Sequence, residues 1–163
     1  MKNTVYIETT IPSYLISKLS RDIFVLSHQE ITKNWWNNHR KEYSLFTSKI
    51  VVEEILRGDP ELSKKRKSLL SGIPVLDVTE KIENLAKNYF EFLGIPKKSI
   101  LDSFHLAIAV YNEIDFLLTW NCKHLANAYT RRKLADYNIK FGYKIPDICT
   151  PEELIKSGDL YVN

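Results

Sequence analysis

Three carboxylates and one amide in the sequence have the residue types and placement expected of a metal site. Glu8 follows a short apolar run, and Asn121 follows a second one much later in the chain. Glu54 lies within a helical pattern, and Asp102 opens an apolar helix. Carboxylates held close together repel one another, and the arrangement becomes favourable when Mg²⁺ or Mn²⁺ bridges them. Such metals activate water and stabilise charge on phosphate oxygens, so the predicted chemistry is hydrolysis of a phosphate ester.

Each of these acids also has a structural interpretation. Ser99 and Asp102 have the spacing of a capping box, with Asp in place of Glu or Gln, so Asp102 would then only favour the positive end of its helix. Glu53 and Glu54 would both be solvated. Glu8 is harder to explain in this way, because a carboxylate directly after an apolar strand lies at the edge of the core, where burial without a partner is costly.

The chain alternates short apolar runs with helical patterns. Strands are predicted at residues 4–7, 45–47, 75–76 and 116–119, with a fifth edge strand at 145–149. Helices are predicted at residues 24–40, 50–56, 60–70, 79–93 and 99–111, and a last short helix is predicted from Thr150. This alternation favours a three-layer α/β/α domain, with a mainly parallel sheet of four to five strands covered by helices on both faces.

Sites in open α/β sheets form outside the carboxyl ends of the strands. Glu8 and Asn121 directly follow strands, while Glu54 and Asp102 lie in helices joined to strands by short connections. We therefore expect the four side chains to meet at one edge. Asp115 precedes its strand and would lie about 13 Å away at a rise of ~3.3 Å per residue, so it is excluded from the site.

Length and composition favour one domain covering residues 1–163, with 44% hydrophobic and 26% charged residues. No apolar run approaches the ~20 residues of a membrane span, and the first apolar run is too short for a secretion signal. We expect a cytoplasmic protein without a membrane partner. Cys122 and Cys149 are far apart in the sequence, which favours reduced, structural thiols.

The net charge of +3 permits a polyanionic partner without demonstrating one. The basic clusters at residues 64–67, 97–98 and 131–133 are most simply solvated helix faces. Trp35 and Trp36 favour a core or a dimer interface, whereas Trp120 lies beside the acidic site and is the better candidate for stacking a base. The candidate RNA contacts, all near the acidic motifs in sequence, are Lys49, Arg57, Lys97, Lys98, Trp120 and Lys123.

Four segments, in order, resemble the motifs of PIN domains. Residues 5–10 (VYIETT) are similar to the opening strand, an apolar run followed by an acid and then Thr or Ser. Residues 48–58 (SKIVVEEILRG) resemble the second acidic motif, with the match on Glu54. Residues 102–109 (DSFHLAIA) are similar to the third motif and are the most specific segment, and residues 117–121 (LLTWN) resemble the fourth. The resemblance spans most of the chain.

The resemblance implies a ribonuclease that cuts phosphodiester bonds through metal-activated water. Bacterial members of this size are often toxins of the VapC type, which implies a paired antitoxin protein and homodimerisation. Glu8, Glu54 and Asp102 would position Mg²⁺ or Mn²⁺, with Asp102 or Glu8 orienting the water. Asn121 would complete the catalytic set from the rim. The sequence departs from the family at Glu8, where Asp is usual, and at Asn121, where an acid is common.

Further residues are expected to support the site. Thr9 and Thr119 are candidate hydrogen-bonding groups behind the ligands. His105 shares the helix face of Asp102 and is expected to be packed and hydrogen-bonded rather than a ligand or base. Two rival functions remain. One is a catalytically weak PIN scaffold that binds RNA or a protein partner; the other is a phosphohydrolase, which is disfavoured because Glu8, Thr9 and Thr10 lack the paired acids of that chemistry.

Overall fold

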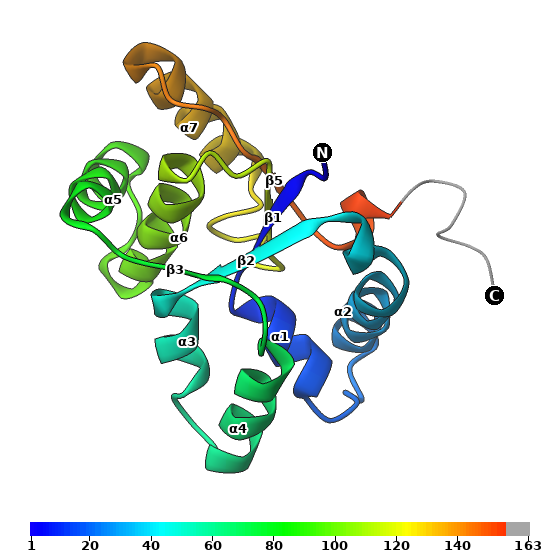
Figure 1. Ribbon diagram of the computed structural model, residues 1–163. Helices are drawn as coiled ribbons and strands as arrows, with labels where there is room; N and C mark the ends of the chain where they lie inside the picture. The colour runs from blue at the N-terminus through cyan, green and yellow to red at the C-terminus, as the bar shows by residue number, and fades with distance from the viewer. Residues whose placement is uncertain (156–163) are drawn as a thin grey trace.

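Five parallel strands form the centre of the molecule, in the order β3-β2-β1-β4-β5 (Figure 1). The computed structural model describes residues 1–155. The predicted domain extends to residue 163, and its last eight residues lie outside the described part. The strands are β1 (Thr4–Ile7), β2 (Ser44–Ser48), β3 (Val75–Leu76), β4 (Phe116–Leu118) and β5 (Asp147–Cys149).

Helices cover both faces of this sheet, with α5 and α6 on one side and α2 on the other (Figure 1). The α-helices are α1 (Thr10–Ile16), α2 (Ile23–Asn34), α3 (Lys49–Ile55), α4 (Pro60–Leu69), α5 (Glu80–Leu93), α6 (Ile100–Tyr111) and α7 (Ala128–Phe141). A π-helical turn, Trp35–His39, extends α2, and short 3₁₀ turns occupy Arg40–Glu42, Lys97–Ser99 and Glu152–Leu154. The predicted three-layer α/β/α architecture is therefore confirmed.

The central position of β1 follows from its composition. Val5, Tyr6 and Ile7 are completely buried, as expected for a strand with neighbours on both edges and helices on both faces. Backbone pairing to β2 on one side and β4 on the other fixes the register of β1. Glu8, the first residue after it, is therefore held at the carboxyl edge of the sheet, between the ends of two neighbouring strands.

Helix signals in the sequence correspond closely to the helices formed. The hydroxyl of Thr79 caps the start of α5 by accepting a hydrogen bond from the backbone N–H of Ile82, and Gly94 ends this helix in the left-handed conformation. The side chain of Ser99, in contrast, makes no capping hydrogen bond to α6, which a 3₁₀ turn precedes. The capping-box interpretation of Ser99 and Asp102 is therefore wrong. The short helix predicted from Thr150 is a 3₁₀ turn.

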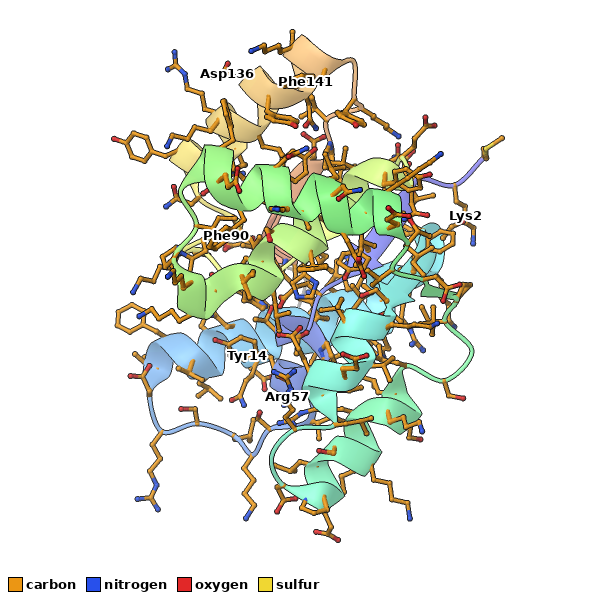
Figure 2. The ribbon with its side chains drawn as sticks, turned by 90° about the vertical axis from the view of Figure 1, so that its left-hand side faces the viewer. Lys2, Tyr14, Arg57, Phe90, Asp136 and Phe141 are labelled. Atoms are coloured by element: carbon orange, nitrogen blue, oxygen red, sulfur yellow. The ribbon has the colours of Figure 1, made fainter. Side chains whose placement is uncertain are left out.

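Helix α7 is one of two α-helices that the sequence analysis did not predict, the other being α1. It begins after Asn127, whose side chain caps it, and ends at Gly142, which has a φ of +73°. Its hydrophobic pattern is weak because the helix contacts the rest of the protein along a narrow strip, which includes Leu134 and Tyr137. Figure 2 shows Asp136 and Phe141 of α7 at the opposite end of the view from Arg57. None of the helices within residues 1–155 is long and apolar enough to cross a bilayer.

Candidate metal centre

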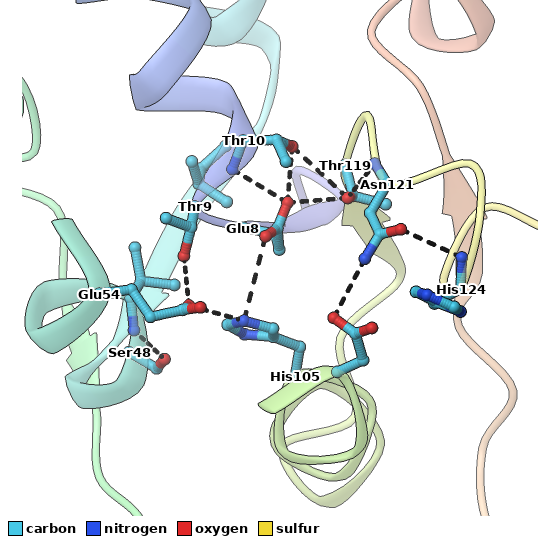
Figure 3. A network of polar contacts seen from close by, with 12 residues as sticks. Glu8, Thr9, Thr10, Ser48, Glu54, His105, Thr119, Asn121 and His124 are labelled. Atoms are coloured by element: carbon cyan, nitrogen blue, oxygen red, sulfur yellow. Dashed lines mark hydrogen bonds and ion pairs between the residues drawn. The ribbon is translucent and has the colours of Figure 1, made fainter. Parts of the chain in front are cut away.

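Glu8 is buried at the carboxyl edge of the sheet with only 4% of its surface exposed. Its Oε2 accepts hydrogen bonds from the backbone N–H of Thr10 at 3.0 Å and from its hydroxyl at 2.6 Å. The Thr119 hydroxyl donates a third hydrogen bond to the same oxygen at 2.7 Å. The other oxygen, Oε1, accepts no hydrogen bond from residues 1–155 and lies 4.0 Å from Nε2 of His105 (Figure 3). One oxygen of this buried carboxylate thus remains available for a cation.

Glu54 lies on α3, the helix that follows β2, and its carboxylate lies close to that of Glu8. Its Oε2 accepts hydrogen bonds from the Thr9 hydroxyl at 2.5 Å and from Nε2 of His105 at 2.9 Å (Figure 3). Its Oε1 has no hydrogen-bond partner within the described chain. Glu53, the adjacent acid, is exposed. The two glutamates therefore use their carboxylates in the same way, with one oxygen held by several hydrogen-bond donors and the other without a donor in the described chain.

His105 connects this pair to the core. It is only 1% exposed, and its Nδ1 lies 2.8 Å from the Tyr6 hydroxyl. That hydroxyl lies 2.7 Å from Oγ of Ser48, which also caps α3 by accepting from the backbone N–H of Val51. The predicted packed and hydrogen-bonded state of His105 is confirmed. Its second nitrogen, however, points at the two glutamates rather than into the apolar core.

Asp102 lies apart from this cluster and is held by a different partner. Its Oδ1 accepts a hydrogen bond from Nδ2 of Asn121 at 3.0 Å. The side-chain oxygen of Asn121 in turn accepts from the backbone N–H of His124. The backbone N–H of Asn121 donates to the Thr119 hydroxyl (Figure 3). Glu8, Glu54 and His105 each bring one ligand atom within 4.8 Å of the others, a group that does not include Asp102.

The titration behaviour of these groups reflects their crowding. Burial raises the pKa of Glu54, but the hydrogen bond and the charge of His105 act in the opposite direction. The net pKa of Glu54 lies below its ordinary value. Burial lowers the pKa of His105, yet Glu54, Glu8 and Asp102 raise it more, so its net pKa is raised. Burial, opposed by His105 and reinforced by the charge of Glu8, raises the pKa of Asp102. All four groups interact electrostatically as one site.

These residues fit a divalent cation. A cation bound at ~2.1 Å holds any two of its ligands within about 4.2 Å of each other, so a cluster of this width needs only small side-chain movements. The two carboxylate oxygens left without donors are the ligand type that Mg²⁺ and Mn²⁺ prefer. The hydroxyls of Thr9, Thr10 and Thr119 orient the carboxylates from behind, as outer groups do in metal sites.

The predicted RNA contacts are spread around this edge. Arg57 is exposed, and its charge lowers the pKa of Glu54, which puts it within electrostatic reach of the cluster. Lys49 forms an ion pair with Asp77 at 2.7 Å. The remaining predicted cations are exposed and flank α6 and Asn121: Lys97, Lys98 and Lys123.

Trp120 does not offer a free ring face on which a base could stack. It is 8% exposed, and its ring stacks on His28 with the centroids 3.9 Å apart. Its Nε1 donates to the Thr32 hydroxyl at 2.7 Å. The predicted role of the Trp120 ring as an RNA contact is therefore wrong, and the ring forms part of the wall behind the site.

Sequence reasoning missed three contributors to the site, namely Tyr6, Thr10 and Ser48. Thr10 belongs to the VYIETT string, so its position beside Glu8 offered a signal for its role. Ser48 begins the second motif and combines an N-cap with a contact to Tyr6. Tyr6 offered no such signal, because its contact with His105 joins residues 99 positions apart in the chain.

Three solved structures share this architecture. A chain of the VapBC2 complex from Rickettsia felis, bound to a promoter DNA fragment, gives a TM-score of 0.52 at 16% identity, covering 90% of this chain and 98% of that one. A chain of FitAB bound to the IR36 DNA fragment gives 0.59 at 11% identity, with 94% and 99% covered. A chain of VapBC-1 from nontypeable Haemophilus influenzae gives 0.57 at 16% identity, with 91% and 98% covered.

The comparisons by sequence add no closer relative. No protein-family profile matches the chain, and no curated protein matches it. The structural matches extend over nearly the whole of each matched chain, so the likeness concerns a complete domain rather than a shared fragment. The chain thus has the α/β/α fold of the VapBC and FitAB neighbours, the architecture that its resemblance to PIN domains predicted.

Proposed function

We propose that this protein is a metal-dependent ribonuclease that hydrolyses RNA phosphodiester bonds. The observation that carries the proposal is the convergence of Glu8 and Glu54 at the carboxyl edge of the sheet, each with one oxygen held by hydrogen-bond donors and one left free. Two carboxylates held this close repel one another, and a divalent cation between them removes that repulsion.

Glu8 and Glu54 would hold Mg²⁺ or Mn²⁺, and Asp102 would contribute an oxygen directly or through a bound water. The cation supplies a lowered pKa for water and neutralises charge on the phosphate. Asp102 orients the attacking water and accepts its proton, while Asn121 holds Asp102 in position through the 3.0 Å hydrogen bond. Water adds to phosphorus, the bond to the leaving oxygen breaks, and that oxygen takes a proton from solvent.

Positive charge near the site favours a polyanionic substrate. Arg57 stands beside Glu54, while the exposed Lys97 and Lys98 precede Asp102 in the chain and the exposed Lys123 follows Asn121. Such cations contact phosphates irrespective of sequence, so they would position an RNA strand without selecting its bases. Lys49 already pairs with Asp77 and would take part only by exchanging that partner.

We further propose that the protein acts as the toxin of a toxin–antitoxin pair and forms a homodimer. The structural neighbours VapBC2, VapBC-1 and FitAB, two of them bound to DNA, support a protein partner. Copurification of a small protein encoded beside this gene, together with loss of RNA cleavage in the complex, is the expected result. Sedimentation of the isolated chain tests the dimer.

A catalytically weak scaffold is the second candidate, and one observation favours it. Asn121 uses both ends of its amide, on Asp102 and on the backbone of His124, in a position where the family commonly has an acid. The site thus carries one negative charge fewer, which weakens cation binding. A scaffold of this kind would bind RNA with the same salt dependence as the proposed ribonuclease but would leave the RNA intact.

Cleavage of a structured RNA pool distinguishes the two functions. The native protein is expected to cut RNA with Mn²⁺ or Mg²⁺, and both EDTA and Asp102→Asn should abolish cutting. An exposed-acid variant, Asp136→Asn on α7, serves as the matched control and should cut at the native rate. Binding without cutting at any metal concentration would favour the scaffold, and full activity in Asp102→Asn would mean that Asp102 is not part of the catalytic site.

A further inference from the structure

The third ligand atom beside Glu8 and Glu54 is a nitrogen. Nε2 of His105 lies 2.9 Å from one oxygen of Glu54 and 4.0 Å from the free oxygen of Glu8, and the imidazole is 99% buried. Asp102, the acid expected to complete the set, is instead hydrogen-bonded to Asn121. The buried cluster therefore offers two carboxylates and one imidazole rather than three carboxylates.

The surroundings of the imidazole suit a metal ligand. Histidine ligands nearly always have their second ring nitrogen hydrogen-bonded, which fixes the ring orientation and the tautomer. Nδ1 of His105 has such a partner in the Tyr6 hydroxyl, which is in turn linked to Ser48. Tyr6 and Ser48 are fully buried on β1 and β2, so the ring is anchored by the central strand of the sheet and its neighbour.

The hydrogen-bond chain accommodates both states of the site. Without a cation, Nε2–H donates to Glu54, and Nδ1 accepts from Tyr6. With a cation, Nε2 presents its lone pair, and Nδ1–H donates to Tyr6, whose hydroxyl then donates to Ser48. Both orders are compatible with the observed contacts, because either atom can be the donor at the Tyr6–Ser48 and Tyr6–His105 pairs.

We propose that Nε2 of His105 coordinates the cation together with Glu8 and Glu54, and that this ligand makes the site prefer Mn²⁺ and other first-row transition ions over Mg²⁺. The inference rests on the proposed metal-dependent function and specifies its ligand set. Imidazole suits transition ions such as Fe²⁺ and Zn²⁺, whereas Mg²⁺ prefers oxygen ligands and retains several waters. Tyr6 and Ser48 act as positioning residues through His105.

Pulsed electron paramagnetic resonance of bound Mn²⁺ tests the ligand without measuring cleavage. The native protein, labelled with ¹⁵N-histidine, is expected to show a coupling between Mn²⁺ and ¹⁵N that disappears in His105→Gln and persists in His124→Gln. Titration calorimetry should show that His105→Gln weakens Mn²⁺ binding at least about tenfold but Mg²⁺ binding far less, since even groups behind the ligands contribute roughly 10–100-fold.

The outcomes separate the two proposals. Bound Mn²⁺ without nitrogen coupling in the native protein, or a coupling that survives in His105→Gln, overturns the histidine ligand and leaves the ribonuclease proposal standing. Failure of the native protein to bind Mn²⁺ at all overturns both. If His105→Gln does not fold, Tyr6→Phe provides the second test: it should retain the nitrogen coupling and lose about tenfold in Mn²⁺ affinity, and unchanged affinity would contradict the role given to Tyr6.

Discussion

The hydroxyl of Thr119 donates a 2.7 Å hydrogen bond to Oε2 of Glu8, joining the ends of β4 and β1 across 111 residues of sequence. The same hydroxyl accepts from the backbone N–H of Asn121. One side chain thus fixes both the buried carboxylate and the start of the loop that carries the amide. The geometry of the acidic site is set by this group as much as by the carboxylates themselves.

Replacing Thr119 with Val should therefore weaken cation binding without removing a ligand. Val has nearly the same shape but cannot donate to Glu8, so the carboxylate loses orientation. We expect the Kd for Mn²⁺, measured by titration calorimetry, to rise about tenfold. Thr119→Ser keeps the hydroxyl and should bind Mn²⁺ almost as the native protein does. Equal affinities for the Val and Ser variants would show that this hydrogen bond does not organise the site.

Asn121→Asp should make the stability of the protein depend on metal. The substitution replaces a hydrogen-bond donor to Asp102 with a second negative charge at a contact of 3.0 Å. Without metal we expect the free energy of unfolding to fall by about 1–3 kcal/mol, since a partly buried acceptor loses its donor. Added Mn²⁺ should raise the Tm of this variant more than that of the native protein.

Asn121→Ala is the control for that experiment, because it removes the same hydrogen bond without adding charge. It should be destabilised in EDTA and gain no more from Mn²⁺ than the native protein. A similar response to Mn²⁺ in the Asp and Ala variants would mean that the position lies outside the reach of the cation.

Asp115, at the opposite edge of the sheet, should stabilise the folded protein in a pH-dependent way. Hydrogen bonds from Lys144 and from Thr4, whose backbone N–H and hydroxyl both donate, hold the pKa of Asp115 at about 2, below its ordinary value. A lowered folded-state pKa stabilises the protein above the unfolded pKa near 3.8, and this stabilisation is lost as the pH falls through about 2. Asp115→Asn should therefore lower the Tm at pH 6, with the difference shrinking between pH 4 and pH 2.

Asp136→Asn makes the same charge change at an exposed position of α7. Its Tm should follow that of the native protein at every pH. A Tm difference for Asp115→Asn that stays constant down to pH 2 would exclude the ionised carboxylate as its source.

The basic residues around the site should act on RNA through charge alone. Arg57→Ala and Lys123→Ala are each expected to weaken binding of different single-stranded RNA sequences to a similar extent, and to reduce the slope of log K against log salt by about 1. Lys140→Ala, near the end of α7, is the control and should leave the slope unchanged. Fluorescence anisotropy between 50 and 200 mM salt measures the effect, and a loss confined to one RNA sequence would instead indicate base recognition.

Much of the fold could be predicted because its signals are local. Short apolar runs, caps such as Thr79 and the terminating Gly94 each act within a few residues, and the alternation of strands and helices then favours a parallel sheet. Helix α7 was missed because an exposed helix buries few side chains and leaves little periodicity. The buried strip of α7 depends instead on contacts with α5, such as the hydrogen bond between Tyr89 and Asn138.

The candidate site was predictable in part for the same reason. Glu8 follows β1, and Glu54 lies in the helix that directly follows β2. The ends of adjacent parallel strands lie at the same edge of a sheet, so the convergence of the two residues follows from the order of elements. The orientation of His105 and the partner of Asp102 depend on side chains from distant segments, which no local pattern specifies. Trp120 follows β4 next to the site, but its ring is covered by His28 of α2.

The measurement that tests the central claim most directly is single-turnover cleavage of an end-labelled RNA across a Mn²⁺ titration, for the native protein and Glu54→Gln. Glutamine can still accept a hydrogen bond from Thr9 but carries no charge for the cation. We predict saturable cleavage by the native protein, and in Glu54→Gln a half-saturating Mn²⁺ concentration at least about tenfold higher or no cleavage at all. Cleavage that is independent of Mn²⁺ and resists EDTA, or an unchanged titration in Glu54→Gln, would contradict a metal-dependent ribonuclease at this site.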